Sequence, residues 1–279
     1  MFTTPDFPLS SRPRRPAVQN LDMDAPVTIV TGGTYGIGRG ITLELARRGH
    51  RVVAFGLEAR QPGSMAEHGV EGTRAALAEA GLEAELLEAD VTEPADVERV
   101  AEVAVSRYGR IDGLVNNAAI HPSGTILETS LETWNQVLAV NLTGMFLMTK
   151  AVLPRMLAQG GGAIVNVASK ASWGQPNLLA YSASKGGVLG FSFGLGYDHL
   201  FERIRVNVVV PSGVDSGMTE GPFRPPQRPQ AGWVRRAQPT DIAQAVAFLL
   251  SEEAELISGA VLNVNSFAGQ GGPPRQPSG

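Results

Sequence analysis

The sequence predicts a single α/β domain, a doubly wound parallel sheet of about seven strands flanked by helices. Short β-branched apolar runs alternate with helical periodicities from about residue 26 to residue 265, and no change of composition divides this stretch. That alternation is typical of repeated strand–helix units around a parallel sheet. The first apolar run, 27–31, leads directly into a glycine-rich loop and then into helical spacing that ends at Gly49. This order favours a phosphate-binding loop at the start of the first helix.

The other elements follow from local periodicity. Each expected strand is a short run dominated by Val, Ile, Leu or Ala. These runs lie at 27–31, 51–55, 84–89, 111–115, 163–167, 204–210 and 260–264. Each expected helix repeats apolar residues every three or four positions. After the first helix, these patterns lie at 73–80, 95–108, 131–157, about 180–201, and 241–250.

Proline and glycine mark the segments outside these elements. Residues 61–72 are expected to form a Pro/Gly loop, longer than such connections usually are. Residues 1–25, with several Pro and Arg, are expected to form a flexible arm, and residues 269–279 a flexible tail. Residues 26–268 are therefore expected to form the one folded domain.

Composition excludes several classes of function. Of 279 residues, 43% are hydrophobic, which is ample for a core, and the net charge of −4 argues against nucleic acid as a partner. The chain has no cysteine and its four histidines are scattered, so neither a thiol nucleophile nor a metal site is indicated. The first 25 residues lack the apolar core of a signal peptide, and no apolar run approaches a membrane span. We therefore expect a cytoplasmic protein without a membrane partner.

Polar residues and glycines stand where the expected strands end. They are the loop from Gly32, then Asp90, Asn116, Ser169 and Ser212. In a parallel sheet the carboxyl ends of the strands meet at one edge, and ligands bind beyond that edge. Residues that are scattered in the sequence are therefore expected to converge on one site.

Tyr181 and Lys185 are four residues apart, so on a helix they share one face, one turn from each other. A lysine ammonium beside a phenol favours the phenolate and so lowers the pKa of the tyrosine from its usual value of about 10. A tyrosine activated in this way can donate and accept a proton. The alternative is that Tyr181 and Lys185 are a chance pair on a solvated helix face. The other motifs of the sequence distinguish this interpretation from the catalytic one.

Taken together, these motifs resemble the classical short-chain dehydrogenase/reductase family over about residues 26–265. The cofactor loop of that family, Thr-Gly-x-x-x-Gly-x-Gly, matches Thr31-Gly32-x-x-x-Gly36-Ile37-Gly38. Its Asn-Asn-Ala-Gly matches Asn116-Asn117-Ala118-Ala119, with alanine as the last residue. Its catalytic tetrad matches, in order, Asn141, Ser169, Tyr181 and Lys185. Its later motifs match Arg205-Val206-Asn207 and Pro211-Ser212-Gly213, with Ser212 where glycine is usual.

The resemblance implies a Rossmann-like fold and an NAD(P)-dependent oxidoreductase that transfers a hydride between the nicotinamide and an alcohol or ketone. Tyr181 would be the general acid/base and Ser169 would hold the substrate oxygen. Lys185, together with the positive nicotinamide of the oxidised cofactor, would lower the pKa of Tyr181, and it would also bind the nicotinamide ribose. Asn141 would hold a water that links Lys185 to solvent, and a buried structural amide is the alternative for this residue.

The resemblance also implies a set of cofactor contacts on the glycine loop and at later strand ends. They are Thr31, Gly32, Thr34, Tyr35, Gly36, Ile37, Gly38, Asp90, Val91, Asn117, Ala118, Tyr181, Lys185, Pro211, Gly213, Val214 and Ser216. Asp90 would reach the adenine, and a helix N-cap in Asp90-Val91-Thr92 is a second interpretation of it.

Gly56 and Leu57 stand where an acid would hold the ribose 2′-hydroxyl of NAD. The absence of an acid removes repulsion toward a 2′-phosphate. NADP is therefore favoured over NAD, with Arg39 or Arg60 as the phosphate partner.

Two further expectations concern the surroundings of the site. Residues 212–238, rich in Pro, Gly and Arg, would form a lid over the substrate, the alternative being a solvated excursion. The helices at 131–157 and about 180–201 are apolar around much of their circumference, so they are expected to form core or subunit interface. We therefore expect a homo-oligomer, a tetramer or a dimer.

Two other functions remain open at this stage. One is a non-catalytic dinucleotide sensor or scaffold on the same fold. The other is a lyase or epimerase of the same family. An intact Tyr181–Lys185 pair argues against the first of these.

Overall fold

The computed structural model describes residues 24–58, 69–214 and 237–264, and within them seven strands form one parallel sheet. The strands are β1 (Val27–Thr31), β2 (Arg51–Gly56), β3 (Glu85–Glu88), β4 (Gly113–Asn116), β5 (Gly162–Val167), β6 (Ile204–Pro211) and β7 (Val261–Val264). Their order across the sheet is β3-β2-β1-β4-β5-β6-β7. The predicted fold class and strand number are confirmed, with strand ends shifted by one or two residues.

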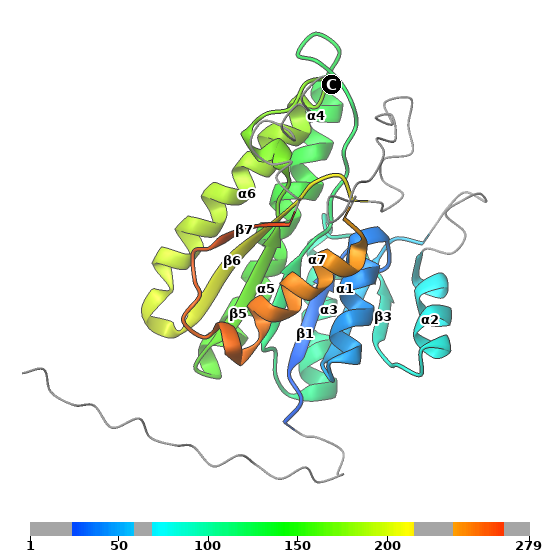
Figure 1. Cartoon of the computed structure of the whole chain (residues 1–279), viewed down its shortest axis with the longest axis vertical. Helices are drawn as coiled ribbons and strands as arrows, with labels where there is room; N and C mark the ends of the chain where they lie inside the picture. The colour runs from blue at the N-terminus through cyan, green and yellow to red at the C-terminus, as the bar shows by residue number, and fades with distance from the viewer. Residues whose placement is uncertain (1–23, 59–68, 215–236, 265–279) are drawn as a thin grey trace, which may run out of the picture.

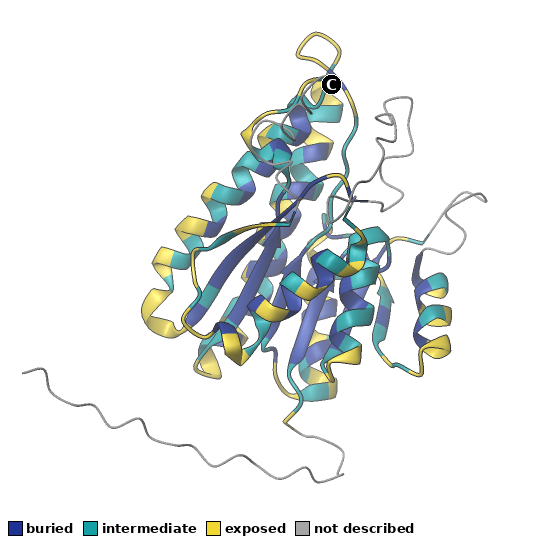
Figure 2. Cartoon of the chain, viewed as in Figure 1, coloured by how far each residue is buried: buried dark blue, intermediate teal, exposed yellow. Residues whose placement is uncertain are grey.

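Helices cover both faces of this sheet (Figure 1). They are α1 (Gly36–Arg47), α2 (Gly69–Glu79), α3 (Pro94–Tyr108), α4 (Leu131–Leu138), α5 (Gly144–Ala158), α6 (Leu179–Asp198) and α7 (Pro239–Leu250). Alternate side chains of the strands feed two separate cores. Ile29 of β1 packs with Val100 of α3 and Val152 of α5. Val30, the next residue, packs on the opposite face with residues of α1 and α7. The strands are consequently buried along the middle of the molecule (Figure 2).

Helix α2 begins at Gly69, inside the segment where a Pro/Gly loop was predicted. The Glu58 side chain explains the early start, because its carboxylate accepts a hydrogen bond of 2.9 Å from the backbone N–H of Val70. This stabilises the first turn of the helix. The contact joins residues twelve positions apart, so it could not be predicted from the local periodicity of the sequence. The predicted loop residues 61–68 lie outside the described residues.

The predicted helix 131–157 is present, but a π turn at Ala139–Thr143 divides it into α4 and α5. By length and composition the run Leu131–Ala158, with a mean hydropathy of 1.5, resembles a membrane span. The statement that no apolar run approaches a span was therefore wrong. Its side chains explain the hydropathy, because Met148, Val152 and Met156 are fully buried against the sheet. Among the described residues this is the one helix of such length and hydropathy.

The strand order reverses between β1 and β4, which lie side by side at the centre of the sheet. The chain runs from β1 outward to β2 and β3, then returns to β4 and continues to the other edge. In sheets of this kind the crevice beyond the carboxyl ends of the two central strands is the ligand site. The residues after β1 and β4 are therefore the first candidates for function.

Candidate active site

The loop after β1 is shaped by glycines. Gly32 and Gly36 have φ of 60° and 43°, in the left-handed region where other residues are strained. A Cβ at Gly38 would overlap the carbonyl oxygen of Gly32 and the side-chain nitrogen of Asn117. Helix α1 follows at once, with no acidic side chain in its first turn. A glycine loop on an acid-free helix N-terminus suits a pyrophosphate.

Asn117 and Thr31 fasten this loop to the end of β4. The Asn117 side chain donates to the carbonyl oxygens of Thr31 and Gly32 at 3.0 and 3.1 Å. In return the Thr31 hydroxyl accepts the backbone N–H groups of Asn117 and Ala118, both at 2.9 Å. These residues were predicted as cofactor contacts, and the structure adds that they hold the loop itself. Sequence reasoning missed this role because the bonds join residues 85 to 87 positions apart.

Ser169 and Tyr181 come together from β5 and α6. Ser169 follows the end of β5 in an extended conformation and starts the 3-10 turn Lys170–Trp173. Its hydroxyl accepts the N–H of Ala171 at 3.2 Å and is near enough to the Tyr181 phenol to act on its pKa. Tyr181 lies in the first turn of α6 and is only 8% exposed. The structure thus brings the two predicted residues together.

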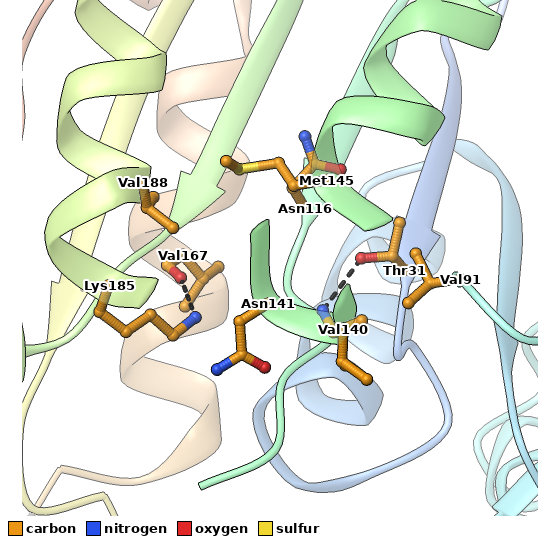
Figure 3. Close-up of a pocket in the computed structure, with 10 residues that line it drawn as sticks. Thr31, Val91, Asn116, Val140, Asn141, Met145, Val167, Lys185 and Val188 are labelled. Atoms are coloured by element: carbon orange, nitrogen blue, oxygen red, sulfur yellow. Dashed lines mark hydrogen bonds between the residues drawn. The ribbon is translucent and has the colours of Figure 1, made fainter. Parts of the chain in front are cut away.

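Lys185 lies one turn further along α6 and is 3% exposed. Its ammonium donates to the carbonyl oxygen of Val167 at 2.7 Å (Figure 3). The same nitrogen lies 5.8 Å from the centre of the Tyr181 ring. Burial lowers the pKa of Lys185 to about 8. The lysine is therefore close to titrating at physiological pH.

The pKa of Tyr181 is raised, mainly because the phenol is buried, while the neighbouring Ser169 hydroxyl acts in the opposite direction. Removal from water disfavours the phenolate. The Lys185 ammonium is hydrogen-bonded to Val167 and is not among the groups that shift this pKa. The expected lowering, which also invokes the positive charge of the oxidised nicotinamide, stays a prediction.

Asn141 sits in the π turn and is buried. Its side chain forms a closed pair with the backbone of Ile120, at 2.8 and 2.9 Å, and donates to the Ser184 hydroxyl at 3.0 Å. The interpretation as a buried, fully bonded amide matches these contacts. Asn141 also lines a cavity of about 10 Å³ together with Lys185 and Asn116 (Figure 3). A space of this size holds about one water molecule.

Asp90 and Val91 follow β3. The Asp90 carboxylate accepts the backbone N–H and the hydroxyl of Thr92, both at 2.8 Å. It is not the N-cap of α3, because the N-cap position is Glu93. The alternative interpretation of Asp90 as that cap is therefore wrong, and the carboxylate closes a tight turn instead. Val91 is buried and lines the same cavity as Lys185.

The end of β2 explains the glycine at position 56. A Cβ at Gly56 would overlap the Thr34 hydroxyl oxygen, which is buried without a hydrogen-bond partner among the described residues. The Nε of Arg39, close by in the first turn of α1, is likewise buried and unpartnered within that part of the chain. Two polar atoms without partners are therefore present at the loop where a cofactor ribose is expected.

The later cofactor contacts follow β6. Pro211 ends this strand, Gly213 has φ of 61°, and Val214 is buried. The Ser212 hydroxyl is buried with no partner in the segments that the structure describes. Ser216, and the predicted lid apart from its two ends, lie outside the described residues. Arg60 lies outside them as well.

Comparisons with known proteins agree with this geometry. A sequence profile described as short chain dehydrogenase matches residues 26–225. D-threitol dehydrogenase of Mycolicibacterium smegmatis is 36% identical over 250 residues, covering 87% of this chain and 92% of the relative. The 3-oxoacyl-acyl-carrier-protein reductase of Thermotoga maritima is 32% identical over 250 residues, covering 87% and 97%.

Among solved structures, a variant of actinorhodin polyketide ketoreductase with NADPH has a TM-score of 0.77 and 33% identity, covering 89% of this chain and 98% of that one. The profile spans more than half of the chain and the named relatives cover almost all of the described domain. The chain belongs to the short-chain dehydrogenase/reductase family and is an NAD(P)-dependent oxidoreductase.

Proposed function

We propose that this enzyme interconverts a ketone and its secondary alcohol with NADP(H), and that Tyr181 is its general acid/base. The observation that carries the proposal is the convergence of Ser169, Tyr181 and Lys185, whose ammonium lies 5.8 Å from the centre of the Tyr181 ring, at the same edge of the sheet as the glycine loop. The nicotinamide, when bound, supplies or takes the hydride. Side chains of the protein would bind the substrate oxygen and transfer the proton.

In the direction of reduction, the substrate carbonyl oxygen would accept hydrogen bonds from the hydroxyls of Ser169 and Tyr181. Donors aimed at the oxygen stabilise the negative charge that develops there. Tyr181 would then transfer its proton to that oxygen. In the direction of oxidation the same phenolic oxygen would take the proton back.

Lys185 and the adjoining cavity support a route for replacing that proton. The lysine has a pKa of about 8, which suits a group that both donates and accepts a proton near neutral pH. The cavity that it shares with Asn141 has room for about one water molecule. We therefore propose that a water held there passes protons between Lys185 and the outside. The Asn141 side chain would act only by fixing the π turn.

The preference for NADP rests on four observations. Gly56 leaves no room for an acid beside Thr34, and the Glu58 carboxylate is engaged by the N–H of Val70. The Nε of Arg39 is a buried donor without a partner among the described residues. A guanidinium is well suited to a phosphate. The related polyketide ketoreductase was solved with NADPH.

Arg39→Ala is expected to raise the KM for NADPH about tenfold or more while changing the KM for NADH less than about threefold, because only NADPH carries the 2′-phosphate. Steady-state kinetics with each cofactor measure this. Arg39→Lys is the matched control, since it keeps the charge and should recover part of the NADPH affinity. Equal losses for the two cofactors would contradict the assignment.

The test of the function itself is a substrate panel read at the absorbance of the reduced nicotinamide. The panel contains a 3-oxoacyl thioester and D-threitol, after the reactions for which the two relatives are named. We expect cofactor-dependent turnover of at least one alcohol or ketone. Tight binding of NADPH without turnover of any member would favour the non-catalytic alternative.

We also propose that the enzyme is a homo-oligomer, a tetramer rather than a dimer. Large apolar side chains are exposed on α4, α5 and α6 and just beyond α6, namely Leu131, Phe146, Phe193, Tyr197 and Phe201. Such a surface favours association. Light scattering at micromolar concentration is expected to give a mass four times that of the chain. A monomer would contradict the proposal.

A further inference from the structure

His121 stands against the proposed acid/base. It lies five residues beyond the end of β4, and its imidazole meets the Tyr181 ring edge-on. The ring centroids are 5.1 Å apart and the ring planes are at 87°. Tyr181 is buried, whereas His121 is only half-buried. His121 is therefore the more exposed of the two rings at this contact.

The backbone around His121 is held firmly. On one side, the N–H and the C=O of Ile120 are both bonded to Asn141. On the other side, Gly124 donates to Asn177 and accepts from Leu179, the first residue of α6. The backbone on both sides of His121 is thus held, and through Gly124 it is tied to the start of the helix that carries Tyr181.

The ring nitrogens of His121 have no hydrogen-bond partner within residues 24–58, 69–214 and 237–264. Among the described residues, neither ring nitrogen takes part in a hydrogen bond or an ion pair, and the contact with Tyr181 is through the ring. Burial lowers the pKa of His121, and no neighbouring charge opposes this. The ring is therefore neutral at physiological pH, with one N–H donor and one nitrogen acceptor. A hydroxyl, which also donates and accepts, matches such a ring better than a carboxylate or a phosphate.

We infer that His121 binds a second oxygen of the substrate, a hydroxyl on the carbon next to the reacting carbonyl. The preferred substrates are then α-hydroxyketones and the corresponding vicinal diols. Oxygens on neighbouring carbons are about one hydrogen-bond length apart, ~3 Å. The contact between the two rings, with centroids 5.1 Å apart, puts the imidazole next to the residue that would bind the reacting oxygen. This inference rests on the proposed role of Tyr181, because it assigns the other oxygen to that residue.

The test compares hydroxyacetone with 2-butanone, in which a methyl group replaces the hydroxyl. A third ketone, 4-hydroxy-2-butanone, carries the hydroxyl one carbon further away. His121→Phe keeps an aromatic ring against Tyr181 and removes both nitrogens. We expect it to lower kcat/KM for hydroxyacetone at least about tenfold and to change the value for the other two ketones less than about threefold. Differences in intrinsic reactivity among the three ketones do not affect this result, because kcat/KM for each ketone is compared between the wild type and His121→Phe.

His121→Gln is the matched control, since its amide again offers a donor and an acceptor. It should recover most of the activity on hydroxyacetone. Unchanged NADPH affinity in both variants shows that the cofactor site is intact. Equal losses on all three ketones would show that His121 only supports Tyr181, and would overturn the inference. So would an unchanged value for hydroxyacetone, or a wild-type enzyme that reduces other ketones but not this one. A wild type that reduces no ketone contradicts the proposed function instead.

Discussion

Tyr181→Phe is expected to lower kcat at least about a hundredfold while leaving the affinity for NADPH nearly unchanged. The substitution removes only the phenolic oxygen, so the buried ring and its edge-on contact with His121 are retained. What is lost is the proton transfer, which general acid/base groups accelerate by about a hundredfold or more. Steady-state turnover and direct titration of NADPH measure the two quantities separately.

The pH dependence of alcohol oxidation gives a second readout for Tyr181. Burial raises the pKa of the phenol, and oxidation requires the phenolate as base. The rate of the wild type should therefore rise from neutral to alkaline pH, and Tyr181→Phe should lose this rise. Ser169→Ala serves as the comparison, because it removes an oxygen-binding hydroxyl but leaves the titrating group. Near-normal turnover in Tyr181→Phe, or a flat profile with chemistry rate-limiting in the wild type, would refute the assignment.

Lys185→Met is expected to reduce turnover about a hundredfold or more and also to weaken NADPH binding about tenfold. The ammonium would serve both the proton route and the cofactor ribose, so both quantities should move. Methionine has a similar length and is apolar, which suits a position that is 3% exposed. Loss of turnover alone, with NADPH affinity intact, would remove the cofactor role and leave only the proton role.

The same variant has an expected effect on stability. Burial lowers the pKa of Lys185 from 10.5 to about 8, so the unfolded chain holds this proton more tightly than the folded chain. The fold is therefore destabilised by roughly 3 kcal/mol below the folded pKa, and this cost disappears as the pH rises to the unfolded value. The free energy of unfolding of the wild type should rise between about pH 8 and pH 10.5, and Lys185→Met should lack this rise. Urea titrations across that pH interval test this, and parallel curves for the two proteins would contradict it.

The outline of the fold could be predicted because it depends on local patterns. Runs of β-branched residues and a helical repeat show a strand or a helix wherever they stand, and their alternation requires a parallel sheet. Element ends were less accurate where a distant side chain sets them, as Glu58 does at the start of α2. The π turn at Ala139–Thr143 also escaped prediction, because the Asn141 contacts with Ile120 and Ser184 lie outside the helix.

The sequence was enough to identify the site residues, but it could not predict their protonation or their hydrogen-bond partners. The spacing of Tyr181 and Lys185 put both on one face of α6. Their protonation behaviour depends on burial and on partners at the end of β5, namely Val167 and Ser169. Val167 lies 18 residues before Lys185 and Ser169 lies 12 before Tyr181, so the helical spacing of the pair carries no information on these contacts.

The sequence by itself determined the fold class, the glycine loop after β1 and the residues that carry the chemistry, since each is written in a short motif. Only the tertiary structure decided that Asn117 holds the glycine loop by hydrogen bonds and that Lys185 is hydrogen-bonded to Val167. It also decided that the His121 ring contacts Tyr181 while its nitrogens have no hydrogen-bond partner among the described residues. The physical reason is the strand order. The central strands β1, β4 and β5 are neighbours in space although far apart in the chain, and hydrogen bonds between their ends follow that packing rather than local periodicity.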